Sequence, residues 1–302
     1  MDWWVYLIIG VVLFILLLSY IFYRKMFHVS KRRPYFDELY LRKRFLPDQY
    51  DEVISWSNSI QYEEVWIESF DHLRLHGRII PNDSDNIVIL VHGYHSNSNR
   101  MLELAKMYFK MNYQVLLVDL RAHGLSEGEY VGIGYFDSFD LQNWVKYVSN
   151  RYFNCKIVLH GFSMGAASIM NMSNVELPNI ECLIADCGFT TMTDELSYKI
   201  CHDFHLPSFP LVQLAELFYC LTSRKNLFAF NPLKNVADAK YPILFIHGIE
   251  DKYVPCYSAV ALNTVCTSRH DILLVPGAGH TFSFREAPKT YQQKIEDFIA
   301  GK

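Results

Sequence analysis

A serine stands between two glycines in the segment Gly161-Phe162-Ser163-Met164-Gly165. This segment follows an apolar run that ends at His160 and precedes Ala166–Met170, a stretch compatible with a helix. A strand, G-x-S-x-G and a helix are the context of a nucleophile elbow, a sharp turn that exposes a serine hydroxyl. The glycines are needed because a β-carbon would clash where strand and helix approach. The pattern predicts that Ser163 is a nucleophile.

A serine hydroxyl needs a neighbouring base to attack a carbonyl at neutral pH. The chain has 12 histidines, and His92, His160 and His247 each precede a glycine at the end of an apolar run. That position suits a structural role in turning the chain. His280 lies beyond the last apolar run, after the glycine-rich segment Pro276-Gly277-Ala278-Gly279. Such a loop can place an imidazole over the elbow, so His280 is the predicted base.

The acid that orients the base should follow a strand and lie between nucleophile and base in chain order. Asp251 meets both conditions, because it comes just after the apolar run that ends at Ile246. Asp186, at the end of the preceding run, is the competing candidate and could instead be structural. We therefore predict a catalytic triad of Ser163, Asp251 and His280.

A tetrahedral intermediate needs two N–H donors for its oxyanion. The backbone N–H of Met164 follows the nucleophile at the start of the expected helix. The second donor should come from the loop after Val91, in His92-Gly93-Tyr94, where the N–H of Tyr94 is the natural choice. Tyr94 and Met164 are therefore the predicted oxyanion hole.

Short apolar runs must form the elements that hold these residues. Continuous runs, rather than alternation, are typical of strands covered on both faces, and they predict an α/β fold with a parallel sheet. Two earlier segments, 65–67 and 73–80, are more polar and predict an antiparallel edge hairpin. The six runs are 87–91, 115–118, 157–159, 183–185, 243–246 and 272–275.

Between Asp186 and Tyr241 the sequence has no short apolar run of the kind that predicts a strand. The segment has helix-like stretches such as 212–221, interrupted by three prolines. It is also rich in aromatic residues, Phe228 among them. We predict a helical cap, at about residues 188–235, inserted over the open end of the sheet.

The chain begins with an uncharged apolar run from Trp3 to Tyr23. A helix of that length is about 31 Å long and matches the hydrocarbon thickness of a bilayer. A cleaved signal peptide would carry positive charge before the run and a small-residue cleavage site after it. Here Asp2 precedes the run and Arg24-Lys25 follows it. The sequence therefore predicts a retained single-pass anchor that contacts the lipid bilayer through residues 3–23.

Charge is distributed unevenly along the chain. Residues 24–44, which include Lys31, Arg32 and Arg33, have a net charge of +6, whereas the chain from residue 45 onward has a net charge of −9. By the positive-inside rule the hydrolytic part lies in the cytoplasm, at the cell membrane. We divide the chain into an anchor at 1–24, a basic connector at 25–61 and a domain at 62–302. The basic connector has two possible roles: it only determines the membrane topology, or it also contacts anionic lipid headgroups.

Several classes of function are excluded or disfavoured. An acidic domain is a poor general binder of nucleic acid, which needs clustered positive charge. The seven cysteines form no CxxC pair and predict buried free thiols rather than a zinc site or a disulfide framework. The glycine cluster at Gly124-Leu125-Ser126-Glu127-Gly128 has no lysine for phosphate binding. No metal and no organic cofactor is implied.

With these motifs in place, the chain resembles the α/β-hydrolase-fold serine hydrolases, in the bacterial branch related to serine aminopeptidases and prolyl-oligopeptidase-like proteins. The resemblance runs from about residue 62 to the end. It implies an eight-stranded, mostly parallel sheet. The single glycine of His92-Gly93-Tyr94 departs from the glycine triplet of some lipases and esterases. The matching motifs are His92-Gly93-Tyr94, 119–126, 161–165, the Asp251 loop and Gly279-His280.

These features predict a hydrolase that cleaves a small-molecule ester or amide through an acyl-enzyme. The aromatic cap favours an apolar acyl group, and hence an esterase. An aminopeptidase is the alternative, and would need cap acids to hold the substrate amine. A non-catalytic, membrane-tethered binding module is a further alternative of a different class. The four available cap acids, which form no pattern in the sequence, are Asp194, Glu195, Asp203 and Glu216.

Overall fold

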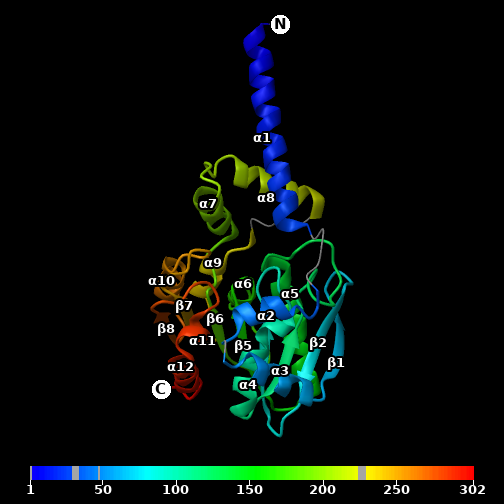
Figure 1. Ribbon diagram of the computed structural model, residues 1–302, viewed down its shortest axis with the longest axis vertical. Coiled ribbons are helices and arrows are strands. Elements are labelled where there is room, and N and C mark those ends of the chain that lie inside the picture. The colour runs from blue at the N-terminus through cyan, green and yellow to red at the C-terminus, as the bar shows by residue number, and fades with distance from the viewer. Residues whose placement is uncertain (1, 29–33, 47, 224–228) are drawn as a thin grey trace.

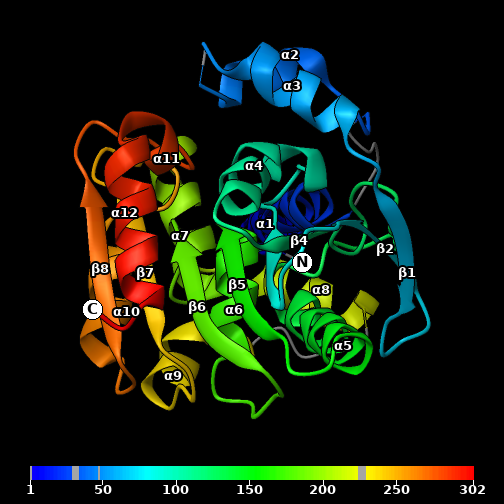
Figure 2. The same ribbon diagram turned by 90° about the horizontal axis from the view of Figure 1, so that it is seen from below.

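The computed structural model describes residues 2–28, 34–46, 48–223 and 229–302. The predicted connector residues Lys31, Arg32 and Arg33 and the cap residue Phe228 lie outside this part of the chain. Eight strands form one sheet in the order β1-β2-β4-β3-β5-β6-β7-β8 (Figure 2). Their bounds are β1 Glu63–Glu68, β2 Arg74–Ile80, β3 Asn86–Val91, β4 Gln114–Val118, β5 Lys156–Phe162, β6 Ile180–Asp186, β7 Ile243–Gly248 and β8 His270–Val275.

The sheet is mostly parallel. Strands β3 to β8 pair in parallel, whereas β1 pairs antiparallel with β2, and β2 antiparallel with β4. The central strands are apolar along their whole length because helices cover both faces, and β3, for example, is buried from Ile87 to Val91. The predicted fold class, the six parallel strands and the antiparallel edge hairpin are confirmed.

Two helical layers enclose the sheet (Figure 2). One face packs on α3, α4 and α12, and the other on α5, α6 and α10, so each face has its own apolar core. The helices of these layers and their short neighbours are α2 Glu38–Arg44, α3 Tyr50–Ser59, the 3₁₀ helix η1 Ser98–Met101, α4 Leu102–Lys110, α5 Tyr135–Arg151, α6 Met164–Asn171, α10 Tyr257–Val265, α11 Ser283–Glu286 and α12 Pro288–Ile299.

The predicted cap consists of α7 Met192–Asp203, α8 Leu211–Ser223 and α9 Pro232–Ala237. No strand is present among the described residues between Asp186 and Tyr241. Helices α7 and α8 lie beyond the carboxyl ends of the parallel strands, where the catalytic loops are expected (Figure 1). The cap therefore covers the edge of the sheet that carries the site.

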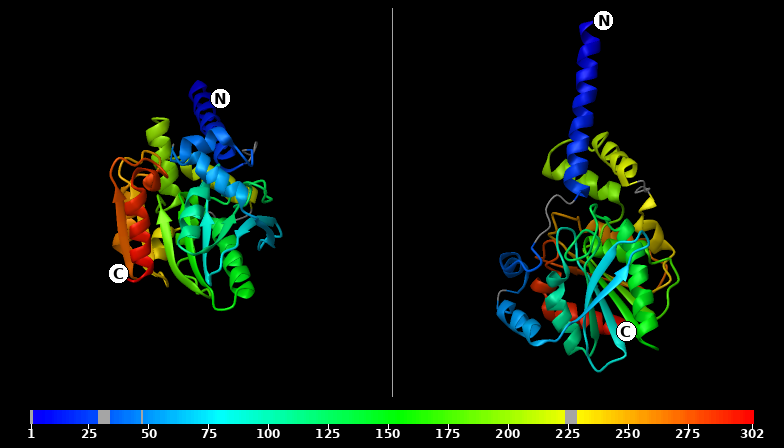
Figure 3. Two further views of the ribbon diagram at one scale, coloured as in Figure 1. Left: turned by 60° about the horizontal axis from the view of Figure 1, so that its bottom comes forward. Right: turned by 90° about the vertical axis from the view of Figure 1, so that its right-hand side faces the viewer.

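Helix α1, Trp3–Phe27, is long and apolar enough to cross a membrane. Its first half projects away from the body, as Figures 1 and 3 show. Its second half packs against α8, and the side chains of Tyr23 and Phe27 are fully buried there. The last turns of α1 are therefore part of the apolar core of the protein.

All seven cysteines are free thiols. Four of them, Cys155, Cys182, Cys187 and Cys266, are buried as predicted. Cys201 is exposed on α7, so the prediction of burial is wrong for this residue, and Cys220 and Cys256 are only half-buried. Helix α7 presents only one face to the core.

Candidate active site

Ser163 occupies the turn between β5 and α6. Its backbone has φ +53° and ψ −114°, a strained conformation for a residue with a β-carbon. The two flanking glycines permit it: a β-carbon at Gly161 would overlap the backbone of Gly165, and one at Gly165 would overlap the Val91 carbonyl oxygen. The backbone N–H of Ser163 donates to the Asp186 carbonyl at 2.9 Å and fixes the turn. The hydroxyl is thus held at the carboxyl edge of the sheet.

His280 lies next to this hydroxyl, although 117 residues separate the two in sequence. Its Nε2 is 2.9 Å from the Ser163 Oγ, and its Nδ1 is 2.7 Å from the Asp251 Oδ2. Burial lowers the pKa of His280, and the hydrogen bond and charge of Asp251 only partly offset this effect. The imidazole is therefore neutral at pH 7 and able to accept a proton.

Asp251 is held by several donors in the loop after β7. Its Oδ1 accepts from the backbone N–H groups of Tyr253 and Val254 at 2.8 and 2.9 Å. Burial raises the pKa of Asp251, but hydrogen bonds from His247 and His280 outweigh burial and hold it well below its usual range. The ring of Tyr253 stacks on His280 with centroids 4.7 Å apart. The sequence analysis did not identify Tyr253 as a positioning residue. The one signal that it offered was the closeness of Tyr253 to Asp251 in sequence.

The competing acid, Asp186, makes different contacts. Its carboxylate accepts from the hydroxyls of Tyr291 at 2.8 Å and Ser283 at 3.3 Å. Burial raises the pKa of Asp186 to about 6. A carboxyl group whose pKa is raised by burial, and whose partners are hydroxyl groups rather than an imidazole, suits a structural role. His160 is likewise structural, because its two ring nitrogens contact the hydroxyls of Tyr108 and Tyr291.

The predicted oxyanion residues Tyr94 and Met164 lie close to the serine, since all three line one cavity. Met164 is the first residue of α6, and Tyr94 follows β3. The next N–H along the chain, that of His95, donates to His123 Nε2 at 3.1 Å and pins this loop. Both Tyr94 and Met164 line cavities that Ser163 also lines.

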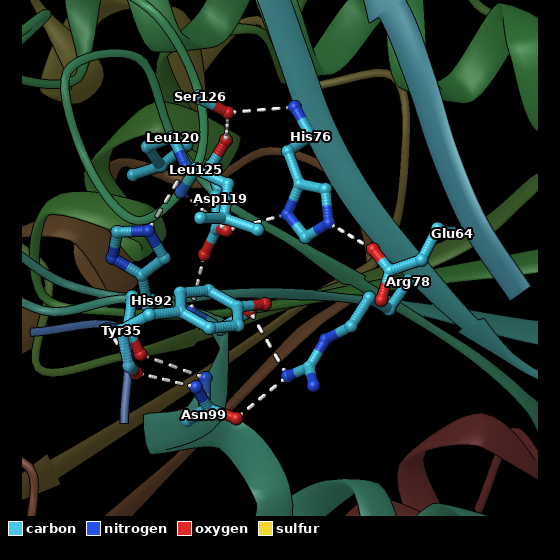
Figure 4. Close-up of polar contacts among 12 residues, drawn as sticks. Tyr35, Glu64, His76, Arg78, His92, Asn99, Asp119, Leu120, Leu125 and Ser126 are labelled. Carbon is cyan, nitrogen blue, oxygen red and sulfur yellow. Dashed lines mark hydrogen bonds and ion pairs between the residues drawn. The ribbon is translucent and has the colours of Figure 1, made fainter. Parts of the chain in front are cut away.

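A buried polar network supports the loop that carries Tyr94 (Figure 4). Asp119, just after β4, accepts from the backbone N–H of Ser98 at 2.8 Å and from His76 Nδ1 at 2.7 Å. The other ring nitrogen of His76 contacts Glu64. His92 Nε2 accepts from the Leu120 N–H at 3.0 Å. The network ties the loops after β3 and β4 together.

The charges of this network reinforce one another. Burial lowers the pKa of His76, but hydrogen bonds to Asp119 and Glu64 outweigh burial and raise it above its ordinary value. Burial likewise raises the pKa of Asp119, and the contact with His76 more than reverses that effect. Both shifts favour the charged forms of the pair, an imidazolium and a carboxylate. The Asp119 motif was singled out in the sequence, but its histidine partner was not.

Two cavities meet at Ser163. The first, about 310 Å³, is lined by polar groups that include Arg44, Arg100 and His280. Arg44 comes from α2 in the predicted connector, and Arg100 Nη2 donates to the Thr281 carbonyl at 3.0 Å. The second is small, about 40 Å³, and apolar. Its lining includes Met26 of α1, Ile133, Met164, Phe189, Met192 and Leu196.

Within the described part of the chain, Cys187, Asp251 and His280 form the one group of three metal-type side chains with ligand atoms close together. Burial and the neighbouring acids hold the pKa of the Cys187 thiol far above its usual range, so it is not a thiolate ligand. Asp251 and His280 already bond to one another. The donor set therefore suits a proton relay better than a metal site.

Comparisons with known proteins agree with the fold. The family model for serine aminopeptidase, S33, matches residues 82–216. YqkD of Bacillus subtilis, an uncharacterised protein, is 26% identical over 223 residues, which is 73% of each chain. An uncharacterised membrane protein of Saccharomyces cerevisiae is 23% identical over 251 residues, 82% of each chain.

Among solved structures, the esterase Pf2001 of Pyrococcus furiosus superposes with a TM-score of 0.66 and 26% identity. The match covers 81% of this chain and 94% of the esterase. These likenesses confirm the resemblance seen in the motifs. The chain has the α/β-hydrolase fold, and its likeness to hydrolases of this fold supports a hydrolase.

Proposed function

We propose that this protein is a serine esterase that cleaves carboxylic esters of apolar acyl groups, with Ser163, Asp251 and His280 as its triad. The observation that carries the proposal is the unbroken relay from Asp251 Oδ2 through His280 to Ser163 Oγ, at 2.7 and 2.9 Å. A serine bonded to a neutral base, which is itself oriented by an ionised acid, is the arrangement that activates a serine for acyl transfer. The esterase Pf2001 of similar fold supports the choice of reaction.

The mechanism follows from these contacts. His280 Nε2 takes the hydroxyl proton as Ser163 Oγ bonds to the acyl carbon, and Asp251 stabilises the imidazolium that forms. The N–H groups of Tyr94 and Met164 bind the oxyanion. The ester C–O bond then breaks, and His280 returns its proton to the leaving alcohol. Water, deprotonated by His280, attacks the acyl-enzyme and releases the acid.

The two cavities suggest how a substrate lies. The acyl group points toward the small apolar cavity beneath the cap, whose lining is mostly methionine, leucine and aromatic side chains, with Glu195 and Lys199 among them. The alcohol part faces the larger cavity with Arg44 and Arg100, where polar groups and water are accommodated. This assignment predicts selectivity for the acyl group and tolerance of polar alcohols.

The direct test is hydrolysis of nitrophenyl esters of increasing acyl length by purified wild-type protein and Ser163→Ala. Turnover by wild type and a loss on the order of 10⁴-fold or more in the variant support the proposal. Ser168→Ala is a matched control, since Ser168 is a buried serine on α6 whose hydroxyl only back-bonds to the Met164 carbonyl. Retained turnover in Ser163→Ala overturns the proposal.

An aminopeptidase-like activity is the second candidate, because Glu195, alone among the four predicted cap acids, lines the apolar cavity. Burial raises the pKa of Glu195 to about 8, however, so the carboxyl is mostly neutral at pH 7. A neutral carboxyl is a weak partner for an ammonium group, and this favours the ester.

Glu195→Gln separates the two candidates. An esterase keeps its activity on nitrophenyl esters in this variant. An aminopeptidase loses activity on aminoacyl nitroanilides, with the loss in KM, because the glutamine cannot bind the substrate amine as an ion pair. Wild-type hydrolysis of aminoacyl nitroanilides faster than of nitrophenyl esters would reverse our ranking.

We also propose that α1 anchors the enzyme in the cell membrane with the hydrolase part in the cytoplasm. Three features of α1 support this proposal. The helix is long enough to cross a bilayer, its first turn carries Trp3 and Trp4, and its last turn carries the basic residues Arg24 and Lys25. The protein should resist extraction by high salt and alkaline carbonate, and protease outside intact cells should leave residues 34–302 uncut. Release by salt contradicts the anchor, and external digestion contradicts the orientation.

A further inference from the structure

Only half of α1 stands clear of the protein. Its residues from Trp3 to Phe14 are exposed, apart from a partly covered Val5. Packing against the body begins at Ile15 and continues to the end of the helix. Figures 1 and 3 show the cap beside this second half and the first half projecting beyond it.

Side-chain contacts join the second half of α1 to the cap. The ring of Tyr20 meets Phe218 of α8 edge to face, with centroids 5.6 Å apart. The Tyr23 hydroxyl lies 2.7 Å from the Thr222 Oγ1. Together with the burial of Tyr23, these contacts fix the depth of α8 relative to α1. Helix α1 cannot slide along its axis without breaking them.

The free half is too short to cross a bilayer. Residues 3–14 make a helix about 18 Å long at 1.5 Å per residue. The hydrocarbon layer is about 30 Å thick and needs about 20 residues. The missing length must come from residues 15–23, which lie beside the cap. Tilting α1 would increase the deficit, because a tilted helix spans less of the membrane.

The cap segment from Phe204 to Leu221 is mostly apolar, with His205 as an exposed polar side chain. Between Phe204 and Leu221, the only residue that is formally charged is Glu216, and its side chain is buried. Large apolar side chains exposed in this segment form what we name the cap face: Phe204, Leu206, Phe209, Leu217 and Leu221. Phe209 is 73% exposed and Leu221 67% exposed. Large exposed apolar side chains gathered in one segment of a protein are typical of an interaction site.

We propose that the cap face is immersed in the leaflet next to the hydrolase part, so that α8 lies at the depth of the acyl chains or their boundary with the headgroups. The proposal rests on the proposed anchoring by α1. The occupant is a lipid bilayer because the cap face continues the lipid-facing surface of α1, where Leu17, Tyr20 and Ile21 are exposed beside it. Lys25, near the ring of Phe204, lies at the level expected for headgroups.

Immersion of the cap also specifies where substrate comes from. Met26 lines the apolar cavity at Ser163 and follows the end of the predicted span by only three residues, about 4.5 Å of helix. The cavity thus lies directly beneath the hydrocarbon layer. The acyl group that we propose for the substrate therefore enters from the leaflet, in a membrane-resident ester, rather than from the cytosol.

Tryptophan quenching in vesicles tests the depth of the cap face. Full-length protein is reconstituted in phosphatidylcholine–phosphatidylglycerol vesicles with acyl chains brominated near the headgroup. In a Trp3→Phe/Trp4→Phe background, Leu217→Trp adds a probe on the cap face, and Leu206→Trp adds a second between α7 and α8. Phe153→Trp is the matched control, since Phe153 is 89% exposed in the loop after α5.

We expect the emission added by Leu217→Trp and Leu206→Trp to shift to the blue and to be largely lost in brominated vesicles. The emission added by Phe153→Trp should be unchanged. If Trp3 and Trp4 are quenched in the wild-type protein, measured in parallel, but the cap probes match Phe153→Trp, the anchor stands and the immersed cap is refuted. If neither set is quenched, both fail. Esterase activity does not enter the readout, so loss of that function leaves this test intact.

Discussion

Replacing Asp251 with asparagine tests whether the Asp251 carboxylate sets the tautomer in which His280 can accept the Ser163 proton. Two backbone N–H donors, from Tyr253 and Val254, face the Oδ1 position at 2.8 and 2.9 Å. These donors select the asparagine rotamer with its carbonyl oxygen at that position. The NH₂ group then occupies the Oδ2 position, 2.7 Å from His280 Nδ1. Nδ1 must become an acceptor, which moves the ring proton to Nε2 and points it at Ser163.

A histidine in this tautomer cannot take the serine proton. In a serine protease triad the same substitution lowers kcat by about 10⁴, which corresponds to about 5 kcal/mol of transition-state stabilisation. We expect a loss of this order in kcat/KM for nitrophenyl butyrate at pH 7. The midpoint of thermal unfolding, followed by circular dichroism, must stay above the assay temperature for the comparison to hold.

Asp186→Asn is the matched control, because Asp186 is equally buried and contacts Tyr291 and Ser283 rather than His280. Activity within about tenfold of wild type is expected, because the substitution keeps the backbone carbonyl that accepts from the Ser163 N–H and changes only a carboxylate hydrogen-bonded to Tyr291 and Ser283. The assignment of Asp251 is refuted if Asp186→Asn is crippled in a folded protein while Asp251→Asn remains active.

Three further outcomes are expected. The Ser163→Ala/His280→Ala double variant should be no slower in nitrophenyl ester hydrolysis than either single variant, because the two residues act as one unit; additive losses would contradict this. The wild-type kcat/KM should fall about tenfold per pH unit on the acid side, with its midpoint below about 6.5, since burial lowers the pKa of His280 and only the neutral ring is a base. An acid midpoint above 7 would contradict the neutral relay. Phe27→Ala should lower the free energy of unfolding, measured by denaturant titration, by about 3–5 kcal/mol because Phe27 is fully buried. The control Phe153→Ala should lower it by less than about 0.5 kcal/mol. Equal losses would mean that the end of α1 is not part of the core.

Local sequence patterns were enough to predict the sheet and the order of the site residues. Apolar runs mark strands buried on both faces, and G-x-S-x-G between such a run and a helix marks the elbow, so Ser163 could be placed without long-range information. His280 and Asp251 followed from chain order, since parallel strands bring their carboxyl-terminal loops to one edge of the sheet.

Long-range packing could not be predicted in the same way. Tyr20 and Tyr23 have the residue type of an interfacial belt, yet Tyr23 is buried against the cap and Met26 reaches the apolar cavity. Arg44 belongs to a segment that the charge pattern assigns to topology, and it lines the larger cavity. Such contacts depend on where the cap helices lie over the sheet. The local spacing of residue types in the sequence does not predict that position.

Covalent labelling with a fluorophosphonate tests the central claim most directly. The probe phosphonylates only a serine activated by a neighbouring base, so the wild-type protein should gain the mass of one adduct, located by peptide mapping on Ser163. His280→Ala should label far more slowly, and Ser163→Ala should not label there at all. A folded wild-type protein that gains no adduct, or gains it on another residue, would contradict the proposed nucleophile.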